Sequence, residues 1–289
     1  MNEPEKVLHS PLGKETVYAN QYDPSLLYPI ERDINWQLRG VDRSTLPFYG
    51  EDIWNAYELS WLNEKGKPVV ALGEFHIPAS STHIVESKSF KLYLNSYNLS
   101  RFRSADDVKK QMEHDLSIAA GGKVTVVLTY PDDAVVVESF EGRCIDDLDI
   151  EVDHYEPAPE LLAASGPEIS ESLVSHLLKS NCPVTGQPDW ASIQITYRGS
   201  KIDEQGLLAY LISYREHGDF HEQCCETIFM DIYERCQPTE LTVYARYVRR
   251  GGLDINPFRS TLDSLATIWV CQDLTLARPH TTEHGTSYT

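Results

Sequence analysis

The chain has 289 residues, of which 41% are hydrophobic and 24% charged, and its formal net charge is −19. This length and composition exclude a disordered protein and favour two domains of ordinary size. The negative charge repels nucleic-acid backbones and anionic membrane surfaces, so we expect neither as a partner.

The sequence predicts a cytoplasmic protein with reduced thiols. The first ten residues, MNEPEKVLHS, lack the apolar core of a secretory signal peptide. No apolar run approaches the roughly 20 residues that span a bilayer. Six cysteines without a C-x-x-C pair do not form a disulfide framework.

Strand-length runs of β-branched and aromatic residues predict strands at 53–62, 69–75, 124–130 and 134–140, and again at 191–198, 207–214 and 241–249. The segment 154–168 contains three prolines and several small residues, which is typical of a linker. We therefore expect an N-terminal module at 1–153 and a C-terminal module at 169–289.

The clearest helix should begin at Ser104, whose hydroxyl can cap the backbone of Asp107. Val108, Met112 and Leu116 then recur every four residues. A second helix is predicted at about 170–179, which would leave the following cysteine in a turn just beyond a helix end.

A weak internal repeat links the two halves. In each half two strands lead to a predicted helix and then to another strand. A glutamate, Glu86 or Glu222, stands at the N-terminal end of each of these helices. This interpretation aligns HIVESKSFKLYLNS with DFHEQCCETIFMDIYERC. The pattern alone leaves both duplication and chance open.

Several familiar motifs are absent from the sequence. No dinucleotide-binding G-x-G-x-x-G follows a strand, and neither a P-loop nor a G-x-S-x-G elbow occurs. His221 and Glu222 begin like a zinc-protease motif, but Cys225 stands where the second histidine is required. A zinc site formed by His221 and Cys225 is an alternative that lacks further ligands.

The block CPVTGQPDWA (182–191) carries the most chemistry. A thiolate at Cys182 suits attack on an electrophilic carbon. Asp189, if Trp190 and Pro188 exclude water from it, would stay protonated and could act as a general acid. In the alternative interpretation, Asp189 only caps the start of a strand.

The two glutamates suit recognition of a flat base. A carboxylate can accept two parallel hydrogen bonds, which matches the ring N–H and the amine on the edge of guanine. Glu222 is the better candidate because Phe220 could cover the base. Alternatively, each glutamate only stabilises a helix N-terminus.

Four blocks together, ESKSFKLYLNS (86–96), CPVTGQPDWA (182–191), FHE (220–222) and RRGGLDINP (249–257), closely resemble the 7-cyano-7-deazaguanine reductases. These are the NADPH-dependent nitrile reductases of queuosine biosynthesis. The resemblance implies an α+β fold of two tandem tunnelling-fold (T-fold) modules, with antiparallel sheets and helices packed on one face. It also implies a homodimer and no metal.

The same resemblance implies residue roles. Cys182 would form a covalent thioimide with the nitrile, Asp189 would donate a proton, and two NADPH would reduce the nitrile to an aminomethyl group. The deazapurine substrate would be bound by Val85, Glu86, Ser87, His221 and Glu222. The NADPH would be bound by Ser87, Lys88, Arg250 and Gly251.

Two other hypotheses remain on the residues alone: a zinc-dependent purine hydrolase of the same fold, and a purine-binding module without catalysis. The sequence does not show whether one chain or two completes each pocket.

Overall fold

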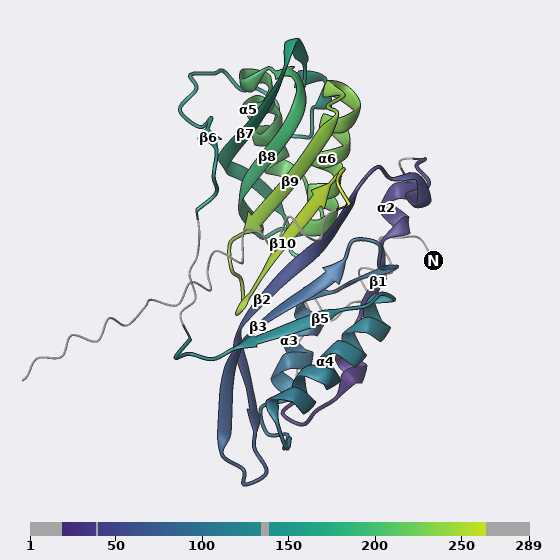
Figure 1. Cartoon of the computed structure of the whole chain (residues 1–289), viewed down its shortest axis with the longest axis vertical. Coiled ribbons are helices and arrows are strands. Elements are labelled where there is room, and N and C mark those ends of the chain that lie inside the picture. Colours follow the sequence, from purple (N-terminus) through teal and green to yellow (C-terminus); the bar gives the residue numbers. More distant parts are fainter. Residues whose placement is uncertain (1–18, 39, 134–138, 264–289) are drawn as a thin grey trace, which may run out of the picture.

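The computed structural model describes residues 19–38, 40–133 and 139–263, and its centre is one long twisted sheet (Figure 1). In spatial order the strands are β5 (Thr125–Thr129), β3 (Pro68–Pro78), β2 (Tyr49–Leu62), β10 (Leu253–Ser260), β9 (Glu240–Tyr247), β8 (Pro188–Ile202), β7 (Ala164–Asn181) and β6 (Arg143–Cys144). Neighbouring strands are antiparallel except β6 and β7.

The remaining elements lie around this sheet. The helices are α2 (Asp33–Leu38), α3 (Ser87–Ser96), α4 (Ala105–Ala120), α5 (Glu204–Ile212) and α6 (His221–Cys236). Short 3-10 turns are η1 (Pro24–Leu26), η2 (Arg43–Thr45), η3 (Pro159–Leu161) and η4 (Ser213–Glu216). A separate two-stranded sheet pairs β1 (Pro29–Glu31) with β4 (His83–Val85).

The chain contains two modules, each with two long strands, two helices and a return to the sheet, which confirms the predicted α+β class and two-module organisation. The modules share one sheet because β10 of the second pairs with β2 of the first, from Leu253↔Ala56 to Ser260↔Tyr49. Strand β7 begins at Ala164, within the segment that we assigned to the linker. The exact module boundaries stay a prediction.

Two secondary-structure predictions were wrong. The helix expected at 170–179 is strand β7, where a bulge between Ser175 and Leu178 interrupts the alternation by which strands are recognised. The strand expected at 207–214 is largely helix α5, which Asp203 caps by accepting from Gly206 N. Its apolar run is buried, and periodicity cannot separate such a run from a strand.

Two further predictions concern helix α4 and the strand expected at 134–140. Helix α4 begins as expected, with Ser104 Oγ accepting from Asp107 N at 3.1 Å, and Val108, Met112 and Leu116 are fully buried. The strand expected at 134–140 lies mostly outside the described residues.

An internal repeat is present, but our alignment of it was wrong. The sequence Tyr-Leu-x-Ser-Tyr occurs at 93–97, at the end of α3, and at 210–214, where α5 continues into η4. In both copies the first tyrosine hydroxyl contacts the second, at 2.6 and 2.7 Å, and donates to an aspartate of the next helix at 2.7 Å. These aspartates are Asp115 on α4 and Asp231 on α6. Helix α3 therefore corresponds to α5, and Glu86 corresponds to Asp203 rather than to Glu222.

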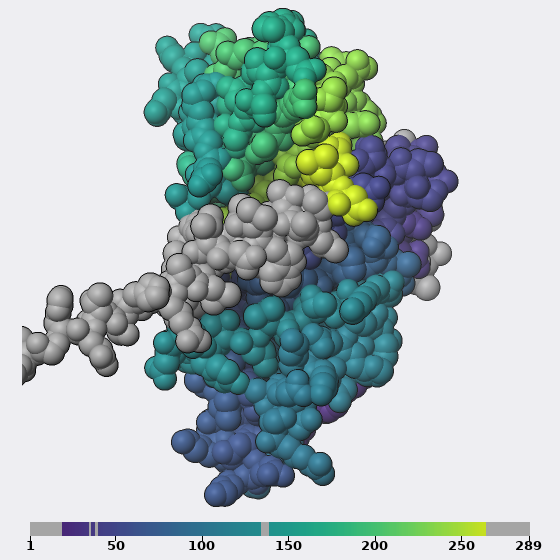
Figure 2. Space-filling model, in the orientation of Figure 1, coloured from purple at the N-terminus to yellow at the C-terminus, as the bar shows by residue number. Residues whose placement is uncertain are grey.

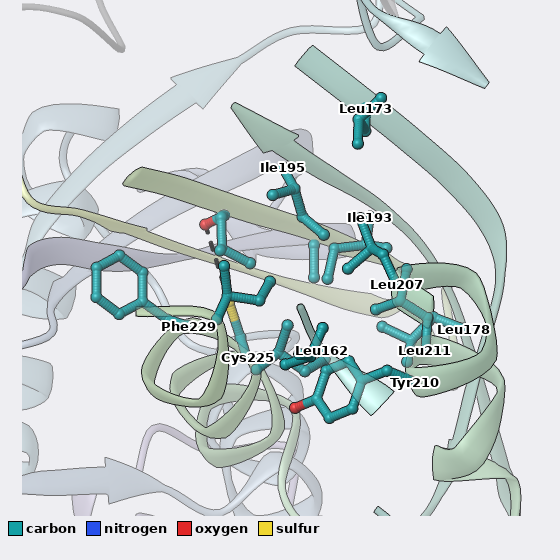
Figure 3. Close-up of a cluster of buried hydrophobic side chains, with 14 of the residues drawn as sticks. Leu162, Leu173, Leu178, Ile193, Ile195, Leu207, Tyr210, Leu211, Cys225 and Phe229 are labelled. Carbon is teal, nitrogen blue, oxygen red and sulfur yellow. Dashed lines mark hydrogen bonds between the residues drawn. The ribbon is translucent and has the colours of Figure 1, made fainter. Parts of the chain in front are cut away.

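Each module has its own hydrophobic core. The first core joins α3 and α4 to β2, β3 and β5, and the second joins α5 and α6 to β7, β8 and β9. Figure 3 shows part of the second core, including Ile193, Ile195 and Phe229. The described residues before β2 form what we call the N-terminal arm. Its Trp36, on α2, also packs in this second core. The space-filling view shows the second module above the first, with the end of β10 at the junction (Figure 2).

A buried charge cluster joins the modules. Arg259 of β10 contacts Asp52 of β2 at 2.7 Å and Glu226 of α6 at 2.6 Å. Arg32 pairs with Asp52 and lies 3.5 Å from Glu226. Trp36 Nε1 donates to the second oxygen of Glu226 at 3.1 Å. Burial opposes the charge on Asp52, but Arg259 and Arg32 outweigh it and hold the pKa of Asp52 below its ordinary value.

The substitution Arg259→Met tests this cluster. Removing one cation leaves two buried carboxylates with one arginine, so we expect the free energy of unfolding to fall by about 3–5 kcal/mol in urea titrations. The matched control is Arg198→Met, because Arg198 forms its ion pairs with Glu168 and Glu240 on the exposed surface. It should cost less than about 1 kcal/mol. Equal effects of both substitutions would contradict a structural role for the cluster.

Candidate active site

A cavity lies where the two modules meet, with about 360 Å³ of empty space. The first module lines it with Trp54, Ile84, Val85 and Ser87, and the second with Cys182, Pro183, Asp189, Asp219, Phe220, His221, Glu222, Arg250 and Ile255. Both modules of one chain therefore supply the residues that the sequence placed in separate blocks.

Cys182 occupies the turn between β7 and β8. Its N–H donates to Gln187 O at 2.8 Å, and Gly186, in the left-handed region at φ 67°, donates to Cys182 O at 3.0 Å. The preceding Asn181 exchanges backbone hydrogen bonds with His217 and Asp219, at 2.8 and 3.1 Å. These contacts fix the turn against the loop before α6, and they hold the thiol, 5% exposed, at the cavity. The thiol follows a strand, not the helix that we predicted.

Asp189 is buried between two cationic or protonatable side chains. Its Oδ1 accepts from Arg250 Nη1 at 2.9 Å, and its Oδ2 lies 3.3 Å from His221 Nε2. The His221 ring stacks on Tyr247 with centroids 3.8 Å apart and planes within 2°. Trp190 is 45% exposed and lies under the guanidinium of Arg215, whereas Asp189 itself is 6% exposed.

Glu222 presents an unpaired acceptor inside the protein. The residue is 2% exposed, and its Oε1 has no hydrogen-bond partner among the described residues. Burial, followed by the nearby charge of Asp52, raises the pKa of Glu222 to about 8. Trp54 Nε1 and His221 Nδ1 are also buried without partners in the described part of the chain. Because buried polar groups are normally hydrogen-bonded, these atoms indicate a polar ligand.

Glu86 does not line the cavity. Its carboxylate caps α3, accepting from Lys88 N at 2.7 Å and from Ser89 N at 2.8 Å. Burial raises the pKa of Glu86. The capping interpretation therefore describes this carboxylate, while its neighbours Val85 and Ser87 face the cavity.

A larger groove, with about 970 Å³ of empty space, lies beside the hairpin that joins β9 to β10 and carries Arg250. Gly251 and Gly252 form the tip of this hairpin, with φ of 62° and 84°, and both line the groove. Lys91 of α3 also lines it and lies 3.5 Å from Glu58. Of the predicted cofactor-binding residues, Gly251 thus lines the groove, Arg250 and Ser87 line the cavity, and Lys88 lines neither.

His221 and Cys225, the two residues of the alternative zinc site, point toward different groups. Cys225 Sγ points to the carbonyls of Val243 and Pro257, at 3.9 and 3.5 Å, whereas His221 Nε2 faces Asp189. Burial raises the pKa of Cys225 above its ordinary value. The geometry therefore gives no support to a zinc site formed by these two residues.

Sequence reasoning missed several residues at the cavity. Trp54 and Ile255 come from the paired strands β2 and β10, and Tyr247 supports His221 from β9. Nothing local distinguishes these residues from ordinary core positions. Asp219 immediately precedes the FHE block, and this proximity was the one available signal. Burial raises the pKa of Asp219, while His217 opposes this rise.

Comparisons with known proteins match both halves of the chain. A family described as "Nitrile reductase, 7-cyano-7-deazaguanine-reductase N-term" matches residues 18–128, and one described as "QueF-like protein" matches residues 188–264. The NADPH-dependent 7-cyano-7-deazaguanine reductase of Chromobacterium violaceum is 56% identical, covering 90% of this chain and 94% of the relative. That of Burkholderia multivorans is 58% identical, covering 87% and 93%.

The chain belongs to the 7-cyano-7-deazaguanine reductase family. Among solved structures, the apo form of the archaeosine synthase QueF-Like is 14% identical and covers 33% of this chain and 94% of its own, with a TM-score of 0.29. In the described part of the chain, no helix is both long and apolar enough to cross a membrane.

The raised pKa of Glu222 predicts a pH dependence of stability. Between its ordinary value of 4.5 and about 8, the folded protein binds a proton at Glu222 that the unfolded chain has released, so stability falls as pH rises. The substitution Glu222→Gln removes this proton. Its free energy of unfolding relative to wild type should rise by on the order of 1 kcal/mol per pH unit across this window.

Urea midpoints of both proteins between pH 5 and pH 9 measure this difference. Glu234→Gln, an exposed position on the same helix, is the control and should follow wild type throughout. A constant gap between Glu222→Gln and wild type would show that Glu222 is ionised in the folded protein over the whole range.

Proposed function

We propose that this chain is an NADPH-dependent nitrile reductase that converts 7-cyano-7-deazaguanine to 7-aminomethyl-7-deazaguanine in queuosine biosynthesis. The observation that carries the proposal is the cavity itself: in a member of this family, the Cys182 thiol, the Asp189–His221 pair and the unpaired oxygen of Glu222 line one cavity.

Recognition of the base is assigned to both modules. The ring N–H and the exocyclic amine of the deazaguanine donate to Glu222; these hydrogen bonds favour its ionised form, so binding of the base releases the Glu222 proton to solvent. The segment of Val85, Glu86 and Ser87 lies opposite; because the Glu86 carboxylate caps α3, it contributes by holding Val85 and Ser87 against the cavity. His221, held flat by Tyr247, completes the set of polar contacts.

The reaction begins with addition of the Cys182 thiolate to the nitrile carbon. A carbon–sulfur bond forms, one π bond of the nitrile opens, and the nitrogen takes a proton from Asp189 to give a neutral thioimide. Hydride addition to the thioimide carbon breaks its π bond, and departure of the Cys182 thiolate with the carbon–sulfur electrons gives a neutral imine. A second hydride and a proton convert this imine to the amine. His221, 3.3 Å from Asp189, is placed to restore the proton to that carboxyl group.

The groove beside the cavity fits the cofactor. NADPH supplies the two hydrides, one from each of two molecules. Of the cationic side chains, Lys91 lines the groove and Arg250 lines the cavity, and we assign the phosphates to these two; a contact with Lys88, which lines neither space, stays a prediction. The backbone at Gly251 allows close approach because no side chain projects there. Arg250 lines the cavity while Gly251 lines the groove, so this hairpin connects the two spaces. Ser87 reaches the same junction from α3.

Exclusion of water protects the imine from hydrolysis to an aldehyde. Phe220 lines the cavity directly before α6 and can cover the bound base. We further propose that the protein acts as a homodimer in the cytoplasm. Its net charge of −19 favours the free base over nucleic acid as the substrate.

Incubation with 7-cyano-7-deazaguanine should increase the mass of the intact reduced protein by that of the whole ligand, and peptide mapping should locate the increase at Cys182. Cys182→Ala should lose both the adduct and turnover while still binding the base. Cys144→Ala removes an exposed thiol away from the cavity and should keep the adduct.

Wild type should also consume two NADPH for each amine formed, followed by nicotinamide absorbance. Turnover without any adduct at Cys182 would refute covalent catalysis. A ratio of one cofactor per turnover would refute the full reduction.

The groove assignment predicts a selective defect in Lys91→Gln. Loss of one cation facing a phosphate should raise KM for NADPH by about tenfold or more. Adduct formation at Cys182 should be unchanged, because Lys91 does not line the cavity. Lys109→Gln, which removes an exposed lysine paired with Glu113 on α4, is the control. An unchanged KM in Lys91→Gln would place the cofactor elsewhere.

A further inference from the structure

Three side chains of metal-ligating type meet at the outer edge of the sheet, away from the cavity and the groove. They are Cys144 at the end of β6, Asp146 just after it, and His176 of β7, and their ligand atoms all lie within 4.8 Å of one another. None of the three lines either space described above. The reaction proposed for this chain makes no use of them.

The backbone fixes where these side chains lie. Strand β6 pairs in parallel with β7, Cys144 opposite Val174, and Ile145 N donates to Val174 O at 3.0 Å. The bulge of β7 begins directly after Ser175 and leaves His176 exposed on the same edge. Two segments that are distant in sequence are thus held together before any ion binds.

Neighbouring groups orient two of the three ligands. Asp146 Oδ1 accepts from Ser175 Oγ at 2.6 Å, and its Oδ2 accepts from His176 N at 2.8 Å, so the carboxylate cannot turn away. His176 Nδ1 contacts Ser192 Oγ at 2.8 Å, and this contact holds the imidazole ring in one orientation. Partners of this kind are typical of metal ligands, because they fix the ring and the carboxylate in place.

The ligand types and the local charge select the ion. Sulfur, imidazole nitrogen and one carboxylate oxygen match zinc, whereas magnesium and calcium prefer oxygen ligands alone. Cys144 is the exposed thiol among the described cysteines, so an ion can reach it from solvent. The segment after Cys144 is rich in acids, which attract cations: Asp146, Asp147, Asp149, Glu151 and Asp153.

We propose that Cys144, Asp146 and His176 form a binding site for one zinc ion, with water as the fourth ligand. Binding displaces the thiol proton of Cys144 to solvent and forms a zinc–thiolate bond. The ion then fastens the chain at 144–146 to β7, at the edge where β6 contributes only Arg143 and Cys144 to the sheet. This site is structural and separate from the reaction, for which we expect no metal.

The test uses the full chain with Cys182→Ala as background, so that the cavity thiol cannot compete for zinc. Equilibrium dialysis with metal analysis should find one tightly bound zinc per chain. Cys144→Ser and His176→Gln should each weaken this binding by well over tenfold, and Ser192→Ala, which only loosens the histidine ring, by about 10-fold or more. His154→Gln, an exposed histidine beside Asp153 in the same acidic segment, should bind zinc as the background does.

A second measurement leaves Cys144, Asp146 and His176 unmutated, so its result does not depend on whether the variants fold. Zinc should slow alkylation of Cys144 by iodoacetamide at least tenfold, as measured by peptide mass spectrometry, and a chelator should restore the rate. Zinc binding that survives Cys144→Ser and His176→Gln would overturn the proposal. An alkylation rate at Cys144 that is equal with and without zinc would also overturn it.

Discussion

The interaction on which the rest of the structure depends is the buried pairing of Arg32 and Arg259 with Asp52 and Glu226. Asp52 belongs to the first module, Glu226 and Arg259 belong to the second, and Arg32 comes from the N-terminal arm. The four charges cancel, and no single partner can leave without stranding a buried charge. The cluster therefore fixes how the two modules meet, which hydrophobic contact between them alone would specify less strictly.

This cluster also sets the character of the cavity. Glu222 lies one turn before Glu226 on α6, and its pKa responds to Asp52, Arg32 and Arg259. The charges that join the modules are therefore the charges that Glu222, the proposed base-binding residue, experiences. A cavity built between modules gains both an acidic acceptor from α6 and the segment at Val85 and Ser87 from the other side. Neither module alone could enclose a flat base in this way.

Sequence reasoning found the cavity residues whose signal lies in a short stretch of sequence. It missed the residues that reach the cavity only through strand pairing. The turn at Cys182 and the motif at His221 and Glu222 could be found because their residue types are unusual and adjacent. Trp54 could not, since a strand tryptophan reaches the cavity only through the pairing of β2 with β10. The strand β7 was taken for a helix because its bulge hides the alternation. Glu86 has the expected position, but its carboxylate caps α3 and does not face the cavity.

The two copies of the repeat differ in the turn that joins their two long strands. In the first module, the β2–β3 turn has hydrogen bonds like those of the Cys182 turn: Asn63 N donates to Lys67 O and Gly66 N donates to Asn63 O, both at 2.9 Å. Asn63 thus occupies the place of Cys182, and its Oδ1 accepts from two backbone N–H groups of its own turn, at 3.0 Å. This turn lies at the far end of the first module (Figure 1). The first copy therefore has a turn one residue shorter and without a thiol. Its contribution to the cavity comes from Trp54 in the middle of β2, from the end of β4 and from the start of α3.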